Sequence, residues 1–406
     1  MNVLLVGAGG REHALAWKIA QSPRLGELHA APGNPGIAAI GSCHPLRSDD
    51  PEALLALCRE AGIDLVVVGP EAPLVAGLAD HLRHAGIAVF GPGAAAARIE
   101  GSKSFAKDVM RAAGVPTAGT LAEAQAPCVV KADGLAAGKG VFVCRTEVEV
   151  ADALGRARSL GEAIVVEELL EGDEVSLFAL CDGVDALPLA PAQDFKRLLD
   201  GDEGPNTGGM GSYSPVPALS PEQASELVES VHRPVLRELA ARGAPFQGLL
   251  YAGLMLTDDG PRVLEFNCRF GDPETQAILP RLEGDLLEAL AAAAAGTLAG
   301  VELAAGPKAA VTVVLAAGGY PDKPETGVAL EGIADAEAEG ALVFHAGTAL
   351  RGGSLVSSGG RVLNVTGIGA SVAEARERAY RAVAHIELAG VQYRHDVALR
   401  AVHAPA

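Results

Sequence analysis

The sequence has few basic residues and no paired cysteine motif, and both shortages narrow the possible functions. It carries 32 Lys and Arg against 51 Asp and Glu, a formal net charge of −19. A chain this acidic repels polyanions, so we expect no nucleic-acid partner, and any phosphate site must be built locally. The six cysteines form no C-x-x-C pair, and the start MNVLLVGAGG lacks a basic segment and a cleavage site. We therefore expect a reduced, cytoplasmic protein.

Long apolar runs are also missing. The most apolar window, LLEALAAAAAGTLAGVELAAG, is interrupted by Glu288, Glu302 and three glycines, so it predicts a soluble helix and no membrane partner. The 50 glycines and 25 prolines follow no period, which excludes a repeat array. At about 150 residues per domain, 406 residues predict more than one domain.

Residues 1–100 alternate short apolar runs with helical segments, which predicts an α/β domain with a doubly wound parallel sheet. Ligands of such sheets bind at the carboxyl ends of the strands. The first end, GAGGREH, has Glu12 where a dinucleotide fingerprint needs glycine, and the second strand ends at Ala31 and Pro32 without the ribose-binding acid, which argues against NAD. The glycine turn remains either an anion site at a helix N-terminus or a plain turn.

The rest of the chain divides into two further parts. Residues 101–300 combine helices with paired strands, and a small α+β unit at about 116–187 is expected to move as a lid. Residues 301–406 predict a separate α+β domain.

The stretch VVKADGLAAGKGVFV places two β-rich runs around a glycine loop, Gly134 to Gly140. Its spacing does not match G-x-x-x-x-G-K-[ST], so it is not a Walker A loop. The loop glycines can still offer N–H groups to phosphate oxygens, with Lys131 and Lys139 supplying charge. A hairpin turn without a ligand is the alternative.

The run VLEFNCRF places Glu265, Asn267 and Arg269 two residues apart, hence on one face of a strand. We expect Leu264, Phe266 and Cys268 on the other face. A carboxylate and an amide oxygen suit Mg²⁺, and an arginine fork suits a transferred phosphoryl group. A solvated polar face is the alternative.

Acidic residues also follow a second strand, in AIVVEELLEGDE. They predict either a solvated loop or carboxylates that accept hydrogen bonds from an adenine amino group and a ribose.

The order of these motifs resembles the ATP-grasp superfamily. Within it, GGREHALAW, APGN, GPEAPL, GPNTGGMGSYSP and EFNCRFGDPETQ are similar to the phosphoribosylamine–glycine ligase family, and the likeness runs nearly end to end. The resemblance implies an ATP-grasp fold and a monomeric, ATP-dependent ligase of purine biosynthesis. Such an enzyme joins glycine to 5-phosphoribosylamine through glycyl phosphate, with ATP as cosubstrate and Mg²⁺ or Mn²⁺ as metal.

The resemblance also implies roles for individual residues. Arg269 and Lys131 would be catalytic, and Glu265 and Asn267 would bind the metal. The residues implied to bind ATP are Lys103, Lys131, Gly138, Lys139, Gly140, Glu167, Glu168, Leu170 and Glu174. Those implied to bind phosphoribosylamine are Gly9, Gly10, Arg11, Glu12, Asn34 and Glu71. Those implied to lie near glycine are Asp194, Asn206, Gly208, Gly209, Met210 and Gly211.

Two positions depart from related patterns. Many ATP-grasp enzymes carry a second metal carboxylate where this chain has Gly253, and Phe195 stands where the family often has His, which removes a titratable group. Glu12 or His13 is a candidate base for the amine. Another ATP-grasp carboxylate–amine ligase, a biotin carboxylase-like enzyme, and a nucleotide-binding protein without catalysis remain as alternatives.

Overall fold

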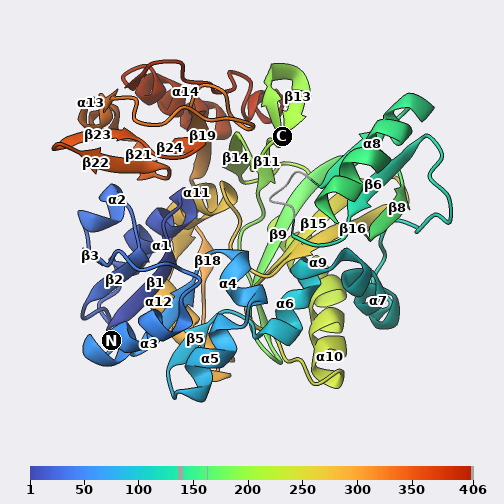
Figure 1. The fold of residues 1–406 in the computed structure, drawn as a ribbon, viewed down its shortest axis with the longest axis horizontal. Helices are drawn as coiled ribbons and strands as arrows, with labels where there is room; N and C mark the ends of the chain where they lie inside the picture. The colour runs from blue at the N-terminus through green and yellow to red at the C-terminus, as the bar shows by residue number, and fades with distance from the viewer. Residues whose placement is uncertain (136–139, 162, 404–406) are drawn as a thin grey trace.

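The protein is described by a computed structural model covering residues 1–135, 140–161 and 163–403. Four larger β-sheets with their covering helices organise the chain (Figure 1). Among the helices of these residues, none is both long and apolar enough to cross a membrane.

The N-terminal domain is built on a five-stranded sheet with the order β3-β2-β1-β4-β5. All four pairings are parallel, which confirms the sequence prediction. The apolar runs form its central strands because both faces of the sheet are covered and every residue of β1 is buried. The strands are β1 (Val3–Gly7), β2 (Leu28–Pro32), β3 (Ser42–Cys43), β4 (Leu65–Val68) and β5 (Ala88–Phe90). The helices that position the site are α1 (Gly10–Ile19), α2 (Pro35–Ala38), α4 (Glu71–Val75), α6 (Ala94–Gly101) and α7 (Lys103–Ala113).

A small antiparallel sheet with the order β7-β6-β8 carries helix α8 (Glu147–Leu160). Its strands are β6 (Cys128–Ala132), β7 (Val141–Cys144) and β8 (Ile164–Glu168). Figure 1 shows this unit at the edge of the molecule, away from the N-terminal domain. The structure differs from the lid expected at 116–187 in one respect. Strand β9 (Asp173–Asp182) belongs to the neighbouring sheet, where its buried run pairs with β15 over ten residues.

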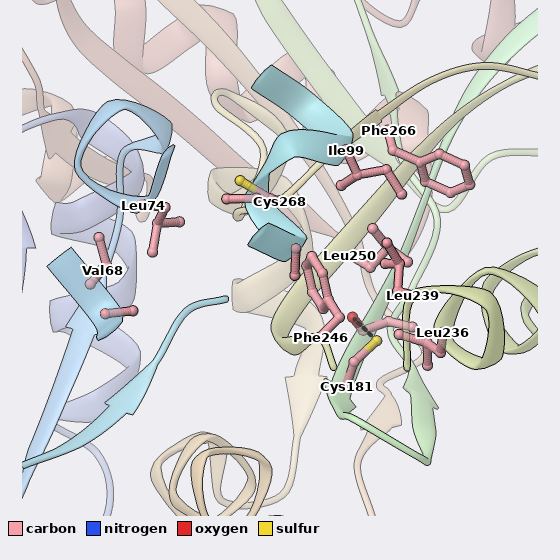
Figure 2. Close-up of a cluster of buried hydrophobic side chains, with 14 of the residues drawn as sticks. Val68, Leu74, Ile99, Cys181, Leu236, Leu239, Phe246, Leu250, Phe266 and Cys268 are labelled. Atoms are coloured by element: carbon pink, nitrogen blue, oxygen red, sulfur yellow. Dashed lines mark hydrogen bonds between the residues drawn. The ribbon is translucent and has the colours of Figure 1, made fainter. Parts of the chain in front are cut away.

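The central sheet is antiparallel, with the order β10-β9-β15-β16. Its strands besides β9 are β10 (Ala186–Pro188), β15 (Gln247–Thr257) and β16 (Gly260–Asn267). One face packs on α6 and on α10 (Arg233–Ala241) in a shared apolar core, and Figure 2 shows Phe266 beside Ile99 and Leu250 within it. Part of the other face packs on α12 (Leu286–Ala295) in a second apolar core, and the rest carries polar side chains such as Ser176 and Glu265. This part of the sheet presents the site.

The C-terminal sheet has the order β11-β14-β19-β24-β21, and α14 (Val372–Val383) covers it. Its strands are β11 (Gln193–Asp194), β14 (Gly211–Ser214), β19 (Ala309–Ala316), β21 (Leu342–His345) and β24 (Arg361–Gly369). Strands β11 and β14 come from the segment expected to form the ATP-binding core. This sheet therefore extends from the C-terminal part into the middle of the chain.

Candidate functional site

The carboxyl end of β16 carries the predicted polar triplet, but its pairing is irregular. Gly253 lies opposite Glu265, whereas the next residue of β15, Leu254, pairs with Val263, so a bulge leaves Leu264 as an extra residue. Val263, and not Leu264, therefore joins Phe266 and Cys268 in the core. The expected inward position of Leu264 was wrong, because a bulge breaks strict alternation.

Two predicted phosphate-binding lysines lie next to this strand. Lys131 on β6 is buried, and its Nζ donates to the Leu264 carbonyl at 3.0 Å, directly beside Glu265. Lys103, at the start of α7, donates through Nζ to the Gly134 carbonyl at 3.0 Å. Burial lowers the pKa of Lys103, although Glu265 opposes that shift. Helix α7 and the small sheet thus bring two cations to the end of β16.

Glu167 lies behind these lysines and is almost fully buried. Its Oε1 is 3.0 Å from Lys107 Nζ, and its Oε2 is 2.7 Å from Lys131 Nζ. Both carboxylate oxygens are therefore paired with lysines. This favours a role for Glu167 in positioning Lys131, in place of the adenine contact that the resemblance implied. Sequence reasoning missed Lys107, although its spacing of four from Lys103 places both lysines on one helix face.

Arg269 follows β16 and joins the central sheet to the N-terminal domain. Its guanidinium lies 3.3 Å from Glu71 Oε2 and 3.2 Å from Glu100 Oε1, and it donates to Asn267 Oδ1 at 3.2 Å. Burial lowers the pKa of Arg269, but Glu100 and Glu71 outweigh it and raise that pKa. Glu100 on α6 also accepts the Cys268 N–H at 2.7 Å. Sequence reasoning missed Glu100 because it lies far from Arg269 in the chain.

Acidic residues gather beside Glu265. Glu174 on β9 pairs with Lys196, and Glu274, at the start of α11 (Glu274–Ile278), accepts from the Tyr251 hydroxyl at 2.7 Å. Burial, partly countered by Lys196, raises the pKa of Asp194, and the carboxylates of Glu274, Glu174 and Glu265 raise it further. Glu174 and Glu274 therefore place carboxylates next to the lysines, whereas a pKa of about 8 favours the protonated form of Asp194 near neutral pH.

Glu265 itself stays ionised in this setting. Burial raises its pKa, but Lys196, Lys131, Lys103 and Arg269 outweigh burial and lower it. Lys196 was not among the predicted site residues, although its spacing of two from Asp194 in an extended segment was a usable signal.

The donor set at the end of β16 is compatible with a hard divalent cation. Glu265 and Asn267 offer one carboxylate and one amide oxygen, and Mg²⁺ commonly adds water and substrate phosphates to such a pair. Within the described ranges, no group of three His, Cys, Asp or Glu side chains is arranged to hold a metal on its own. A metal here would therefore depend on phosphate oxygens.

Some of the residues predicted to bind phosphoribosylamine are buried and stabilise the turn after β1, whereas others line a cavity. Arg11 and Glu12 are buried and bonded to each other at 2.5 Å, and Glu12 also accepts the Gly9 N–H at 2.6 Å. Gly10 is packed against the Asn364 and Gln276 side chains. These contacts make Gly10, Arg11 and Glu12 supports of the turn after β1.

Gly9 and Asn34 instead line a cavity of about 400 Å³ between the N-terminal and C-terminal domains. The rest of its wall comes from Ala8, Gly33, Asp272, Ala346, Gly347, Thr348, Ser358 and Arg361. Arg361 was not predicted; it pairs with Asp272 at 3.0 Å. Glu71 lies outside this wall, on Arg269.

The segment expected near glycine, residues 206–211, contacts both the small sheet and the wall of this cavity. Asn206 donates to the Val141 carbonyl of β7 at 3.1 Å, and the Gly208 carbonyl accepts from Arg361. Gly209, at φ +107°, packs on Pro273. Met210 is buried and Gly211 begins β14, so these two residues support the loop from within the C-terminal sheet.

The Phe195 ring lies 4.7 Å from the Arg394 guanidinium and packs at the C-terminal core. The aromatic ring therefore contributes to the packing of the C-terminal domain.

The hinge residues after β8 are half-buried, and their predicted role stays a hypothesis. Glu168 accepts the Gly119 N–H at 2.7 Å, and Leu170 follows it in the connection to β9. Gly140 accepts the Ala132 N–H at 2.8 Å, which closes the base of the glycine loop. Gly138 and Lys139 lie outside the described residues.

Comparison with known proteins gives one consistent family. Models of phosphoribosylglycinamide synthetase match the chain in three parts: the N domain over residues 1–100, the ATP-grasp (A) domain over 101–275 and the C domain over 310–400. The phosphoribosylamine–glycine ligase of Streptomyces coelicolor is 54% identical and covers 100% of both chains. That of Mesorhizobium japonicum is 53% identical over 99% of both.

Solved structures agree with this result. The phosphoribosylamine–glycine ligase of Thermotoga maritima superposes with a TM-score of 0.84 at 36% identity, covering 98% of this chain and 100% of that one. The biotin carboxylase domain of the Hydrogenobacter thermophilus 2-oxoglutarate carboxylase has a TM-score of 0.71 at 17% identity, over 97% of this chain and 91% of that one. The second likeness shows the ATP-grasp fold alone.

Proposed function

Because the chain belongs to the phosphoribosylglycinamide synthetase family, we propose that its charged site joins glycine to 5-phosphoribosylamine at the expense of ATP. The enzyme is an ATP-dependent ligase of purine biosynthesis. One observation supports the location above all: Lys131 of the small sheet meets Glu265 of β16 and Arg269 just beyond that strand. A transferred phosphoryl group needs this combination of cations and a metal-binding oxygen.

ATP would lie between the small sheet and the central sheet. Lys103 and Lys131 would neutralise its phosphates, and the backbone of Gly140 would lie beside them. The roles predicted for Gly138 and Lys139 concern residues outside the described ranges. The hinge backbone near Glu168 and Leu170 would meet adenine, and Glu174 would hold the ribose. Glu167 would keep Lys131 in place, because both of its oxygens are bonded to lysines.

A divalent metal, Mg²⁺ or Mn²⁺, would be held by Glu265 and Asn267. When bound, it neutralises phosphate charge and orients the oxygens of the transferred group. Arg269 would contribute a positive charge at the same place, since its guanidinium already donates to Asn267.

The two other substrates would approach from opposite sides of the site. Phosphoribosylamine would occupy the cavity lined by Gly9 and Asn34, beside the turn after β1. Glycine would lie near Asp194 and the loop 206–211, where the carboxylates of the cluster suit an ammonium group.

The reaction follows from this placement in two steps. The glycine carboxylate attacks the γ-phosphorus of ATP and expels ADP, and the lysines and Arg269 offset the developing charge. The amine of phosphoribosylamine then attacks the acyl carbon of glycyl phosphate and expels phosphate. The small sheet would exclude water in between, because an acyl phosphate hydrolyses readily.

We further propose a monomer acting in the cytoplasm. All six cysteines are free thiols, and free thiols are typical of a reducing compartment. Size measured by light scattering tests the oligomeric state.

The testing experiment is ADP release by the purified enzyme with Mg²⁺-ATP, glycine and freshly generated 5-phosphoribosylamine, leaving out one component at a time. ADP that forms only with all three, together with glycinamide ribonucleotide, is the expected result. ADP with a different acid or amine would keep the ATP-grasp chemistry and reject these substrates. ATP binding without ADP under any condition would favour a nucleotide-binding protein.

A further inference from the structure

The loop 346–348 of the C-terminal domain is held in place by the N-terminal domain. It connects β21 to β22 (Thr348–Arg351) and forms one wall of the cavity that Gly9 and Asn34 also line. Just before it, His345 has both backbone polar groups engaged: its N–H donates to His13 Nδ1 at 2.8 Å, and its carbonyl accepts from Asn34 Nδ2 at 2.9 Å. Two side chains from one domain thus fix one residue of the other.

His13 is suited to this contact and unsuited to proton transfer through the same nitrogen. Its ring is buried on α1 and packs edge-on against Phe344, with ring centres 5.6 Å apart. Since Nδ1 accepts a hydrogen bond, the ring proton belongs on Nε2. Burial, and then His345, lower the pKa of His13 to about 3, so the ring stays a neutral acceptor at physiological pH.

Asn34 connects three segments at once. Its Oδ1 accepts the Ile37 N–H at the start of α2, and its Nδ2 donates to the Ala8 carbonyl at 2.9 Å as well as to His345. Gly36, in α2, leaves the space that the His13 ring occupies, because a Cβ there would lie 2.2 Å from Cε1 of that ring. The turn after β1, helix α2 and the loop 346–348 are therefore mutually positioned.

We infer that His13 and Asn34 are positioning residues that hold the loop 346–348 as a wall of the phosphoribosylamine site. This inference rests on the proposed function, which places that substrate in the cavity. Asn34 also lines the cavity itself, whereas His13 is not part of its wall and acts through the backbone of His345. Loss of the His13 contact weakens phosphoribosylamine binding and spares ATP and glycine, since their proposed residues do not contact this loop.

The test compares His13→Leu with His13→Asn. Leucine removes the acceptor, whereas the Oδ1 of asparagine can replace Nδ1. We expect His13→Leu to raise the KM for phosphoribosylamine about tenfold, equivalent to about 1.4 kcal/mol, with the KM values for ATP and glycine within about twofold. His13→Asn should recover most of the loss, and Gly36→Ala should repeat the selective effect by displacing the ring. Gly155→Ala, at a helical glycine with open space, is the control.

Amide hydrogen exchange gives a readout that does not depend on turnover. His13→Leu should accelerate exchange at His345 N–H, and ribose 5-phosphate should slow exchange of residues 346–348 in the unmodified enzyme. Equal KM increases for all three substrates, or unchanged exchange at His345, would overturn the inference while leaving the ligase activity established. ADP release that does not require phosphoribosylamine would instead overturn the proposed function, and this inference with it.

Discussion

Replacing Arg269 with methionine should remove turnover and also weaken the fold. The arginine is the counter-charge for two carboxylates of the N-terminal domain, Glu71 at 3.3 Å and Glu100 at 3.2 Å. Its side chain is only 18% exposed and that of Glu100 8%. Methionine keeps the apolar part of the side chain but leaves both acids without their partner.

The cost can be worked from this geometry. Two unit charges 3.2 Å apart attract by about 5 kcal/mol at an effective dielectric constant of about 20. The energy spent on burying the charges offsets part of this gain, yet removing one member of a buried pair commonly costs about 3–5 kcal/mol. Glu100 retains the Cys268 N–H as a donor, and burial raises its pKa so that it can take up a proton. We therefore expect the lower end, about 3 kcal/mol.

Urea unfolding and ADP release separate the two effects. The double variant Arg269→Met/Glu100→Gln should regain about 2 kcal/mol of the loss, because an amide is far cheaper to bury than a carboxylate, but it should stay inactive. Arg381→Met is the control: its half-exposed pair with Glu377 predicts a change below about 0.5 kcal/mol. A single variant as stable as the unmodified enzyme, or a double variant that regains turnover, would refute this reasoning.

Three further predictions concern the phosphate site. Glu265→Gln should reduce ADP formation at least about a hundredfold with unchanged urea unfolding; near-normal turnover would move the metal site elsewhere. Asp133→Ala should raise the KM for ATP about tenfold, because its carboxylate accepts the Lys103 N–H at 2.6 Å; unchanged ATP kinetics would show that this contact is dispensable. Chelation with EDTA should stop ADP release, and either Mg²⁺ or Mn²⁺ should restore it; turnover that persists would exclude a metal requirement.

The sequence predicted those parts of the site that depend on local spacing. Glu265 and Asn267 follow two-residue alternation along one strand, and the parallel N-terminal sheet follows from apolar runs separated by helices. The bulge at Leu264 was not predictable, because it depends on register with β15, a partner strand that sequence alternation does not describe.

Long-range partners account for most of what was missed. Glu100 reaches Arg269, and Arg361 reaches Asp272, only after the sheets have packed together. His13 illustrates the same limit: its sequence context made it a candidate base, and only the structure places the backbone of His345 on its ring nitrogen. Lys107 and Lys196 could have been predicted from local spacing. Lys107 follows Lys103 by four residues in a helix, and Lys196 follows Asp194 by two residues in an extended segment.

The distribution of charge explains how so acidic a chain can accept ATP. The net charge of −19 opposes binding of a polyanion at long range, but salt screens exposed charges beyond about 8 Å at physiological ionic strength. Within that distance the balance changes, because Lys103, Lys131 and Arg269 meet around Glu265, and Glu167 pairs with the buried Lys131 at 2.7 Å. Glu174 and Glu274 lie on the other side, toward Asp194, where the proposed ligand carries an ammonium group. Opposite ends of one site can therefore attract phosphates and an amine, with Glu265 facing the cations and Lys196 facing the acids.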